Sequence, residues 1–259
     1  MRRLLPLLAL LCLFGCGARA GTHTACGGKQ ASALLWFQEL TGTLGGRSAA
    51  GAVSAAITGR SDAEPGFALT LKTLGSLCLD LSYTPLSLDT RFSSSGSFTF
   101  GNASFGTVTN GQMRYRMPVW EGALRWIALD NDLFRVSVAA CLKMADADVQ
   151  LTANGIRGTF DHLVPIPMAG ISGQANVTPW FKAYGSFKLL DMDVGPVQSK
   201  AHDWELGVIA DWSTSFKTIR VATGWRELGM DLTAQAGQPD ETRIDVTHSG
   251  PFVEATFSF

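Results

Sequence analysis

The stretch Pro251-Phe-Val-Glu-Ala-Thr-Phe-Ser-Phe259 decides the fold that the sequence predicts. Side chains point alternately to the two faces of a β-strand, so this stretch has two different faces. One face is apolar and consists of Val253, Ala255, Phe257 and Phe259. The other face holds Phe252, Glu254, Thr256 and Ser258 and is mostly polar. A strand with an apolar outer face and a polar inner face suits a barrel in lipid, where every backbone group must be paired.

The same residues resemble the C-terminal signature of bacterial outer-membrane β-barrel proteins, which end in alternating aromatic and apolar residues with a final Phe. The resemblance implies an antiparallel up-and-down transmembrane β-barrel in the outer membrane, in contact with membrane lipids and lipopolysaccharide. It also implies insertion by the outer-membrane assembly machinery, which recognises such a terminal strand. It is specific over the stretch 251–259 alone, and it names no substrate.

The N-terminus resembles an export signal, with two arginines, an apolar run over 4–14 and a small-x-small cleavage site at 18–20. The apolar run is too short to span a bilayer as a helix. An alternative is that residues 13–16 form a lipoprotein signal, which would make Cys16 a lipidated N-terminus. The expected organisation is a signal peptide over 1–20, a periplasmic segment over 21–32 and an outer-membrane β-barrel over 33–259.

Composition excludes some classes of protein. Removing residues 1–20 leaves 21 − 3 = 18 basic against 22 acidic side chains, a net charge near −4. This charge excludes a nucleic-acid binder. Beyond the signal, no apolar run reaches about half the length of a transmembrane helix, yet 46% of the chain is hydrophobic. Hydrophobicity scattered in short alternating runs is typical of barrel strands.

Three cysteines follow the signal. Either Cys26 and Cys78 pair near the periplasmic rim and leave Cys141 free, or all three are unpaired small apolar residues. The chain has no C-x-x-C spacing, so we expect no structural zinc site, and no cofactor is predicted.

Two kinds of connection alternate along the chain and set the predicted number of strands. Short turns are expected around Gly75 and at 130–132, 178–179 and 213–215. Long connections rich in Gly, Ser, Asp and Pro are expected at 45–65, 89–110, 147–163, 194–202 and 232–246. Outer-membrane barrels have short periplasmic turns and long extracellular loops. Four turns and five loops predict ten strands; eight is the alternative, because the first hairpin has the weakest pattern.

Charged side chains on the inward face are predicted to form a network that fills a narrow barrel. These residues are Lys72, Asp80, Glu121, Arg125, Arg135, Lys143, Lys182, Lys188, Asp203, Glu205, Asp211, Arg220, Arg226 and Glu254. Charged residues occupy even-numbered positions before Pro118 and odd-numbered positions after it, so they would lie on opposite faces of one regular strand. A bulge there would return Glu121 and Arg125 to the interior. Pro165 and Pro167 suggest a distorted outer rim.

Aromatic spacing matches a bilayer. Trp204 and Trp212 share a face and lie about 27 Å apart at roughly 3.4 Å per residue. A tilt near 40° makes this about 21 Å along the membrane normal, close to the apolar band of about 25 Å between aromatic girdles. The predicted girdle residues are Trp36, Trp120, Trp126, Trp204, Trp212, Trp225, Phe257 and Phe259.

The charge-filled interior predicts a non-enzymatic envelope or surface protein. A narrow channel for small solutes or ions is the first alternative, and a surface hydrolase is the second. His162, His202 and His248 fall at predicted outer strand ends beside acidic or hydroxyl residues, which general acid–base catalysis uses. Adjacent residues on a strand face opposite ways, however, so these pairs cannot meet locally, and no catalytic residue is assigned.

Four aspartates continue the outward face of their strands beyond the apolar band. They are Asp146, Asp148, Asp191 and Asp193. Carboxylates at head-group height would face lipopolysaccharide phosphates, and a bridging divalent cation would make that contact favourable. The alternative is that these residues are solubilising charge at loop ends.

Overall fold

The computed structural model describes residues 29–48, 51–60, 64–72, 76–194, 197–213, 218–234 and 241–258. The expected signal peptide, Cys16 and Cys26 lie outside the described residues. No helix in the described part of the chain is long and apolar enough to cross a membrane. Cys78 takes part in a disulfide bond, and Cys141 is a buried free thiol.

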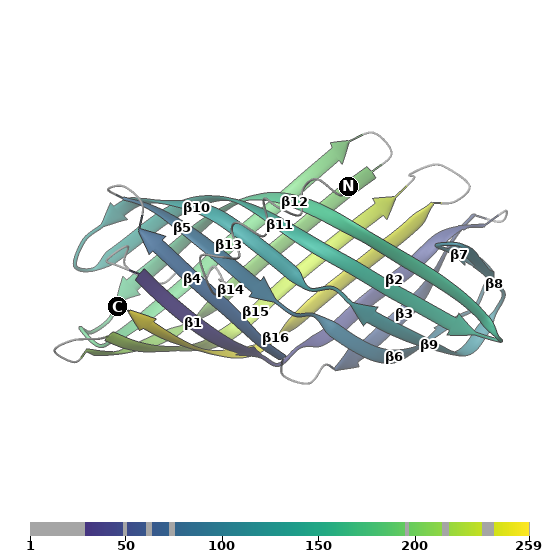
Figure 1. Ribbon diagram of the computed structural model, residues 1–259, viewed down its shortest axis with the longest axis horizontal. Helices are drawn as coiled ribbons and strands as arrows, with labels where there is room; N and C mark the ends of the chain where they lie inside the picture. Colours follow the sequence, from purple (N-terminus) through teal and green to yellow (C-terminus); the bar gives the residue numbers. More distant parts are fainter. Residues whose placement is uncertain are drawn as a thin grey trace, which may run out of the picture.

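The described regular structure consists of sixteen strands, joined into an elongated, strongly tilted array (Figure 1). Their bounds are β1 (Lys29–Trp36), β2 (Glu39–Ser48), β3 (Gly51–Arg60), β4 (Glu64–Lys72), β5 (Leu77–Thr84), β6 (Ser87–Ser94), β7 (Phe98–Phe100), β8 (Ala103–Phe105), β9 (Val108–Arg116), β10 (Val119–Asp130), β11 (Phe134–Ala153), β12 (Ile156–Asn176), β13 (Phe181–Val194), β14 (Val197–Ser213), β15 (Thr218–Ala234) and β16 (Thr242–Ser258). β1 thus begins inside the predicted periplasmic segment 21–32.

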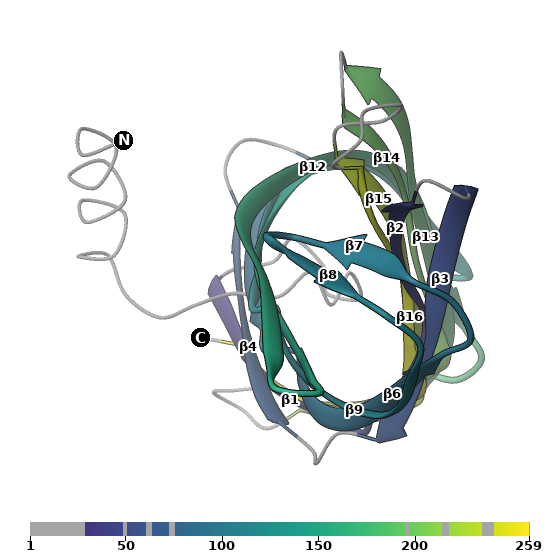
Figure 2. The ribbon, with the colours of Figure 1, turned by 90° about the vertical axis from the view of Figure 1, so that its right-hand side faces the viewer.

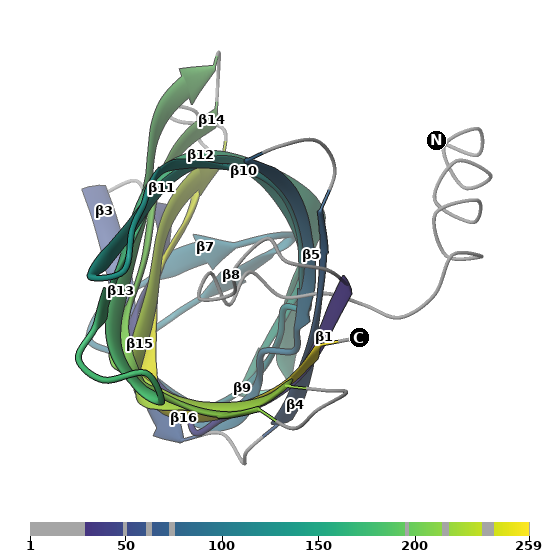
Figure 3. The same ribbon diagram turned by 90° about the vertical axis from the view of Figure 1, so that its left-hand side faces the viewer.

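Sixteen strands exceed the predicted ten because four passes of the chain are each divided into two strands. β1 and β2 lie end to end against β16, and β3–β4, β5–β6 and β9–β10 are similar consecutive pairs. Counting each pair once and omitting the β7–β8 hairpin leaves 16 − 4 − 2 = 10 passes along the barrel. Figure 3 shows the resulting ring, and the predicted antiparallel β-barrel is confirmed.

The terminal strand closes the ring. Residues 252–258 of β16 pair with β1, while residues 242–249 pair with β2. Val253 and Phe257 are exposed on the outside, and Glu254 and Thr256 are buried inside. These are the faces that the alternation predicts.

The polarity of the two faces inverts along the barrel, as β11 shows. Over its first half the outward residues are apolar, from Phe134 to Met144, and the inward residues include Arg135 and Lys143. Beyond Met144 the outward residues are polar (Asp146, Asp148, Gln150 and Thr152), and the inward residues are apolar (Ala145, Ala147, Val149 and Leu151). We call the part with the apolar outer face the membrane half. It contains β1, β4, β5, β10 and the adjoining parts of β11–β16, and we call the rest the distal half.

This inversion corrects the predicted long loops. Most of 147–163 is strand, and only Asn154 and Gly155, both with positive φ, form the turn between β11 and β12. Much of 45–65, 194–202 and 232–246 is also strand. These segments are rich in polar residues because their outer face meets water. They resemble loops when every strand is expected to have an apolar outer face along its whole length.

The same inversion removes the expected bulge at Pro118. On the two neighbouring strands, Arg116 pairs with Ser87 and Asp148. Val119, three residues later in the chain, pairs with Thr84 and Ala145, which are three residues before Ser87 and Asp148. The register therefore continues through Pro118 without an extra residue. Arg114 and Arg116 are exposed on the outer face because they lie in the distal half.

β12 loses one neighbour in the distal half. Its ladder with β13 runs from Asn176–Lys182 to Ala169–Leu189, and residues 156–168 pair with β11 alone. Asn176 N donates towards β11, whereas Thr159 N donates away from it, to Asn102 Oδ1. Pro165 and Pro167 share the parity of Thr159, so their missing N–H groups fall on the β13 side. The prolines thus explain why the ladder ends there.

A short hairpin crosses the distal opening of the ring (Figure 2). β7 and β8 stack Phe98 on Phe105 at 5.3 Å between ring centroids, and Phe98, Phe100 and Phe105 are all buried. Gly101 has φ +55° at the tip, and an added Cβ would lie 1.9 Å from the carbonyl oxygen of Thr159 on β12. A glycine is therefore required where the hairpin docks on the wall.

Candidate functional site

An ionic layer crosses the interior of the membrane half. Lys143 Nζ donates to Glu121 Oε2 at 2.5 Å and to Asp203 Oδ2 at 2.8 Å. Lys188 Nζ donates to Glu121 Oε1 at 2.6 Å. Arg226 binds Asp203 through Nε at 3.0 Å and Nη2 at 2.7 Å. All five side chains are at least 95% buried. The layer is thus a continuous chain of charge-assisted hydrogen bonds.

The strands position these charges by cross-strand pairing. Glu121 lies opposite Lys143 on neighbouring strands, Lys188 opposite Asp203, and Glu205 opposite Arg226. Glu205 also accepts a hydrogen bond of 2.8 Å from the Tyr184 hydroxyl. Three cations and three carboxylates give a neutral layer. Neutrality matters because a buried charge is tolerated only when it is paired and hydrogen-bonded.

Further ion pairs flank this layer. Arg125 binds Asp80, which also accepts from Thr70, and all three are buried. Near the strand ends, Asp211 accepts from Lys182 and Arg220. The remaining predicted lumen residues differ in position: Arg135 pairs with Asp130 at the rim, Glu254 is buried, and the Lys72 side chain lies outside the described residues.

An aromatic and polar layer separates the ionic layer from the distal half. The Arg226 guanidinium lies 4.9 Å from the centroid of the Trp36 ring. Trp36 Nε1 donates to the carbonyl of Gly250 at 3.2 Å. The ring of His248 lies between Tyr115, whose hydroxyl is 3.0 Å from Nε2, and Gln38, whose Oε1 is 3.1 Å from Nδ1. All four ring or amide side chains are buried.

Two predictions are wrong in this layer. Trp36 is not a girdle residue, because it is fully buried inside the barrel. His248 is not at an outer strand end, because it is 2% exposed and hydrogen-bonded inside the barrel. Both errors follow from expecting a polar interior over the whole length of the strands.

The distal interior is an apolar core that the sequence reasoning missed. Its buried side chains come from several strands of the ring and from the hairpin, and include Leu44, Ile57, Phe92, Phe100, Val149, Leu151, Met230 and Val246. The signal that could have found it is the apolar series at 145, 147, 149 and 151. It has the opposite parity to the lipid-facing series at 134–144.

Aromatic side chains bound the apolar outer face of the membrane half. Trp120, Trp126, Trp212, Trp225 and Phe257 are each about half exposed, and Trp204 is half-buried. Trp120 packs against Tyr83 with ring centroids 4.6 Å apart. Phe259 lies outside the described residues.

Several solved structures are similar to this chain. OmpT, an outer membrane protease from Escherichia coli, matches with a TM-score of 0.55 and 11% identity over 92% of this chain and 100% of that chain. The transport unit of the autotransporter AIDA-I from Escherichia coli matches with a TM-score of 0.44 and 8% identity, covering 95% of this chain and 94% of that chain. The toluene transporter TbuX from Ralstonia pickettii matches with a TM-score of 0.38 and 9% identity, covering 89% and 88%. The chain has the fold of the bacterial outer-membrane β-barrels.

No protein-family model matches the sequence, and no curated protein matches it. The barrel fold and the lipid-facing band together place the chain in the bacterial outer membrane. The lipid-facing band covers the membrane half alone, so the distal half extends beyond the bilayer.

The outer-membrane barrel separates the residues predicted for a metal site. Asp146 and Asp148 lie on β11 and Asp191 on β13, with β12 between them, and Asp191 is 3.4 Å from Lys200. The side chain of Asp193 lies outside the described residues. Among the residues that the structure describes, no group of three or more His, Cys, Asp and Glu is arranged to hold a metal ion.

The histidines of the barrel are also apart. His162 on β12 is exposed and stacks on Phe160. His202 Nε2 on β14 lies 3.0 Å from Glu227 Oε1. With His248 inside the barrel, the three imidazoles occupy three separate environments.

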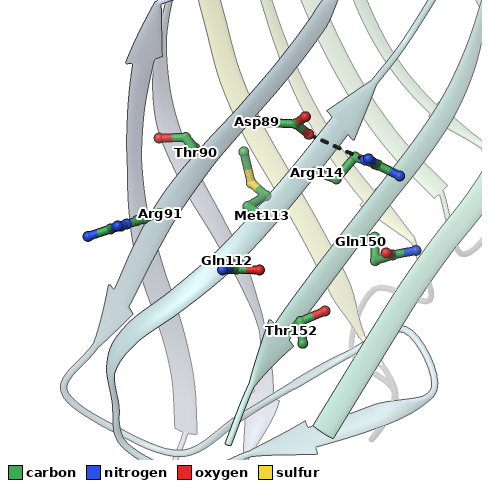
Figure 4. Close-up of a pocket in the computed structure, with 8 residues that line it drawn as sticks. All are labelled: Asp89, Thr90, Arg91, Gln112, Met113, Arg114, Gln150 and Thr152. Atoms are coloured by element: carbon green, nitrogen blue, oxygen red, sulfur yellow. Dashed lines mark hydrogen bonds and ion pairs between the residues drawn. The ribbon is translucent and has the colours of Figure 1, made fainter. Parts of the chain in front are cut away.

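A polar cavity of about 480 Å³ lies on the outer wall of the distal half, across β6, β9 and β11 (Figure 4). Its lining residues are Asp89, Thr90, Arg91, Gln112, Met113, Arg114, Gln150 and Thr152. Arg114 Nε donates to Asp89 Oδ1 at 3.4 Å, and both side chains are more than half exposed.

Proposed function

We propose that this protein is a non-enzymatic outer-membrane barrel with a closed lumen, which acts as a structural or surface protein of the bacterial envelope. The observation that carries this proposal is the pairing of Lys143 with both Glu121 and Asp203 in a fully buried, neutral ionic layer. Charges that line a conducting pore contact water and passing ions, whereas these charges are bound to one another.

The distal half supports the same function. An ion or polar solute entering from outside would have to pass the β7–β8 hairpin and the apolar core below it. Apolar side chains cannot replace the hydration shell of an ion, so this region opposes passage. The hairpin and the outer wall are the parts of the barrel that meet the surroundings.

Planar bilayer recording tests the proposal against the narrow-channel alternative. The folded protein, verified by a heat-modifiable electrophoretic shift, should produce no stepwise conductance under conditions in which a general porin conducts. Reproducible conductance steps that scale with salt concentration would overturn the closed-lumen proposal.

A further inference from the structure

We propose that the distal half binds an extended peptide segment of another protein, which adds to the edge of β12 as a further strand. The segment carries a basic residue opposite Asp161 and an apolar residue opposite His162. The site lies in the wall of the barrel and not in its lumen, so its test is independent of the conductance experiment.

A seam opens in the wall where the ladder between β12 and β13 ends. This ladder runs as far as the pair Ala169–Leu189. Beyond that pair, residues 156–168 of β12 pair with β11 alone, and residues 190–194 of β13 pair with β14 alone. The two strands diverge there, and the β13–β14 hairpin projects from the ring (Figures 2 and 3). The described wall thus presents strand edges on both sides of the seam.

Odd-numbered residues of β12 direct their backbone groups into the seam. Val177 N donates to Phe181 O at 3.1 Å, which shows that odd positions at this end of β12 face β13. The N–H and C=O groups of one residue point the same way in an antiparallel strand. Asp161 and Leu163 therefore direct their N–H groups into the seam, where neither has an acceptor within the described part of the chain. Such an edge is a template for the addition of a strand.

The rest of the edge is protected, which sets the length of the site. Thr159 N donates to Asn102 of the β7–β8 hairpin at 3.2 Å. At the other end of the edge, Pro165 and Pro167 have no N–H to donate, although their carbonyl groups can still accept. The two N–H groups between these positions are therefore the open part of the edge, and they suit a short extended segment.

The seam exposes part of the inner face of β12. His162 lies on the inward face between Phe160 and Val164, yet its side chain is exposed. Its Nδ1 contacts the carbonyl oxygen of Asp161. Val164 and Leu190, on the two sides of the seam, are only partly buried and pack against the distal apolar core. An apolar side chain on the inner face of an added strand would cover this opening and remove apolar surface from water.

The outward side chains beside the seam are mainly acidic. Asp161 lies directly opposite Asp148 on β11, and like charges in this position repel. Arg116 faces Asp148 from β9, on the side away from the seam. Over 146–168 and 190–202, the described outward charges are Asp146, Asp148, Asp161 and Asp191 against Arg157 and Lys200, a balance of 2 − 4 = −2. A basic residue opposite Asp161 on an added strand is thus favoured.

A second copy of this chain in the same membrane does not fit the seam. A two-fold axis that relates two such barrels lies along the membrane normal. The two β12 strands would then run in the same direction along the normal, and tilts near 40° would make them cross at about 80°. Strands that cross at this angle cannot form a ladder, so the occupant is a segment of another protein.

Fluorescence anisotropy of a labelled peptide tests the proposal on the folded full-length protein in detergent micelles. The probe alternates lysine and valine, so that its lysines face outwards and its valines inwards. We expect Leu163→Pro to weaken binding about five- to tenfold, because one of the two N–H donors is lost. Leu163→Thr is the matched control, since it removes the same side chain but keeps the N–H, and it should stay within about twofold of the wild type. Both variants keep the β11 ladder, because the N–H of Leu163 points away from β11.

The charge of the partner has its own test. Asp161→Asn should weaken binding of the lysine–valine peptide about two- to fivefold, because a cross-strand pair of opposite charges is lost. Binding of a serine–valine peptide should not change in this variant. A glutamate–valine peptide that binds as tightly as the lysine–valine peptide would overturn the basic partner.

Further outcomes decide whether the β12 edge itself is the site. Equal affinity of the wild type and Leu163→Pro, or an equal loss in Leu163→Thr, would overturn the proposal. N-methylation of the peptide's lysines should abolish binding, since their N–H groups face β12, and loss on methylation of the valines alone would contradict this pairing. A dimer that forms without peptide and is lost in Leu163→Pro would assign the edge to a second copy and overturn the peptide partner. Retention of the heat-modifiable shift shows that each variant is folded.

Discussion

At the scale of single residues, the character of each side chain follows the medium that its face meets. Leu142 and Asp148 lie on the same outer face of β11, yet the first faces lipid and the second faces water. Lys143, beside Leu142, points inside, where its charge is matched by two carboxylates. Lys143 is therefore the central cation of the interior.

Replacing Lys143 with methionine should destabilise the barrel by about 3–5 kcal/mol. The buried layer would then hold the three carboxylates against two cations, Lys188 and Arg226, and so one unbalanced negative charge. Urea unfolding in lipid vesicles measures this change. The control is Lys200→Met, whose 3.4 Å pair with Asp191 is largely exposed and should contribute less than about 1 kcal/mol. Equal losses in the two variants would show that the ionic layer has no special role in stability.

At the scale of elements, the β7–β8 hairpin depends on one residue at its tip. Gly101 combines a positive φ with close approach to the Thr159 carbonyl, and Asn102 accepts from the Thr159 N–H at 3.2 Å. The hairpin thereby covers part of the β12 edge that Pro165 and Pro167 leave without a β13 partner.

Gly101→Ala should undock this hairpin, since the added methyl overlaps Thr159 and the conformation itself costs about 1–2 kcal/mol for alanine. Limited proteolysis in detergent should then cleave within 98–105 faster than in the wild type. Gly106→Ala is the control in the same connection, because an added Cβ there meets nothing within 4 Å. Similar cleavage of both variants would contradict the docking role of Gly101.

The elements also show what the sequence could predict. The terminal strand and the membrane half were predictable, because in lipid the apolar face of each strand must point outwards and the polar face inwards. The inward positions of Lys143 and Asp203 follow from this alternation. The distal half was not predictable by this rule, because in water the polar face points outwards and the apolar face inwards. Trp36, His248 and the predicted loop at 147–163 were therefore misplaced. The outer cavity was hidden for another reason: its lining residues lie on β6, β9 and β11, which only strand pairing brings side by side.

At the scale of the whole molecule, the barrel is built for two media. Its membrane half has a lipid-facing exterior and an ionic interior, and its distal half has a polar exterior and an apolar interior. The interior is thus filled by two different kinds of packing, with the Trp36–His248 layer between them. The outer wall and the hairpin remain as the surfaces for interaction.

Cysteine scanning along β11 tests this account most directly. Single cysteines would be placed at 138–152 in a Cys141→Ser background and treated in liposomes with a water-soluble maleimide. The account predicts labelling at outward distal positions 146, 148, 150 and 152, and protection at lipid-facing positions 138, 140 and 142. It also predicts protection at inward positions 145, 147, 149 and 151, where the apolar core excludes water. Labelling of 147, 149 and 151 would reveal a water-filled lumen and contradict the account.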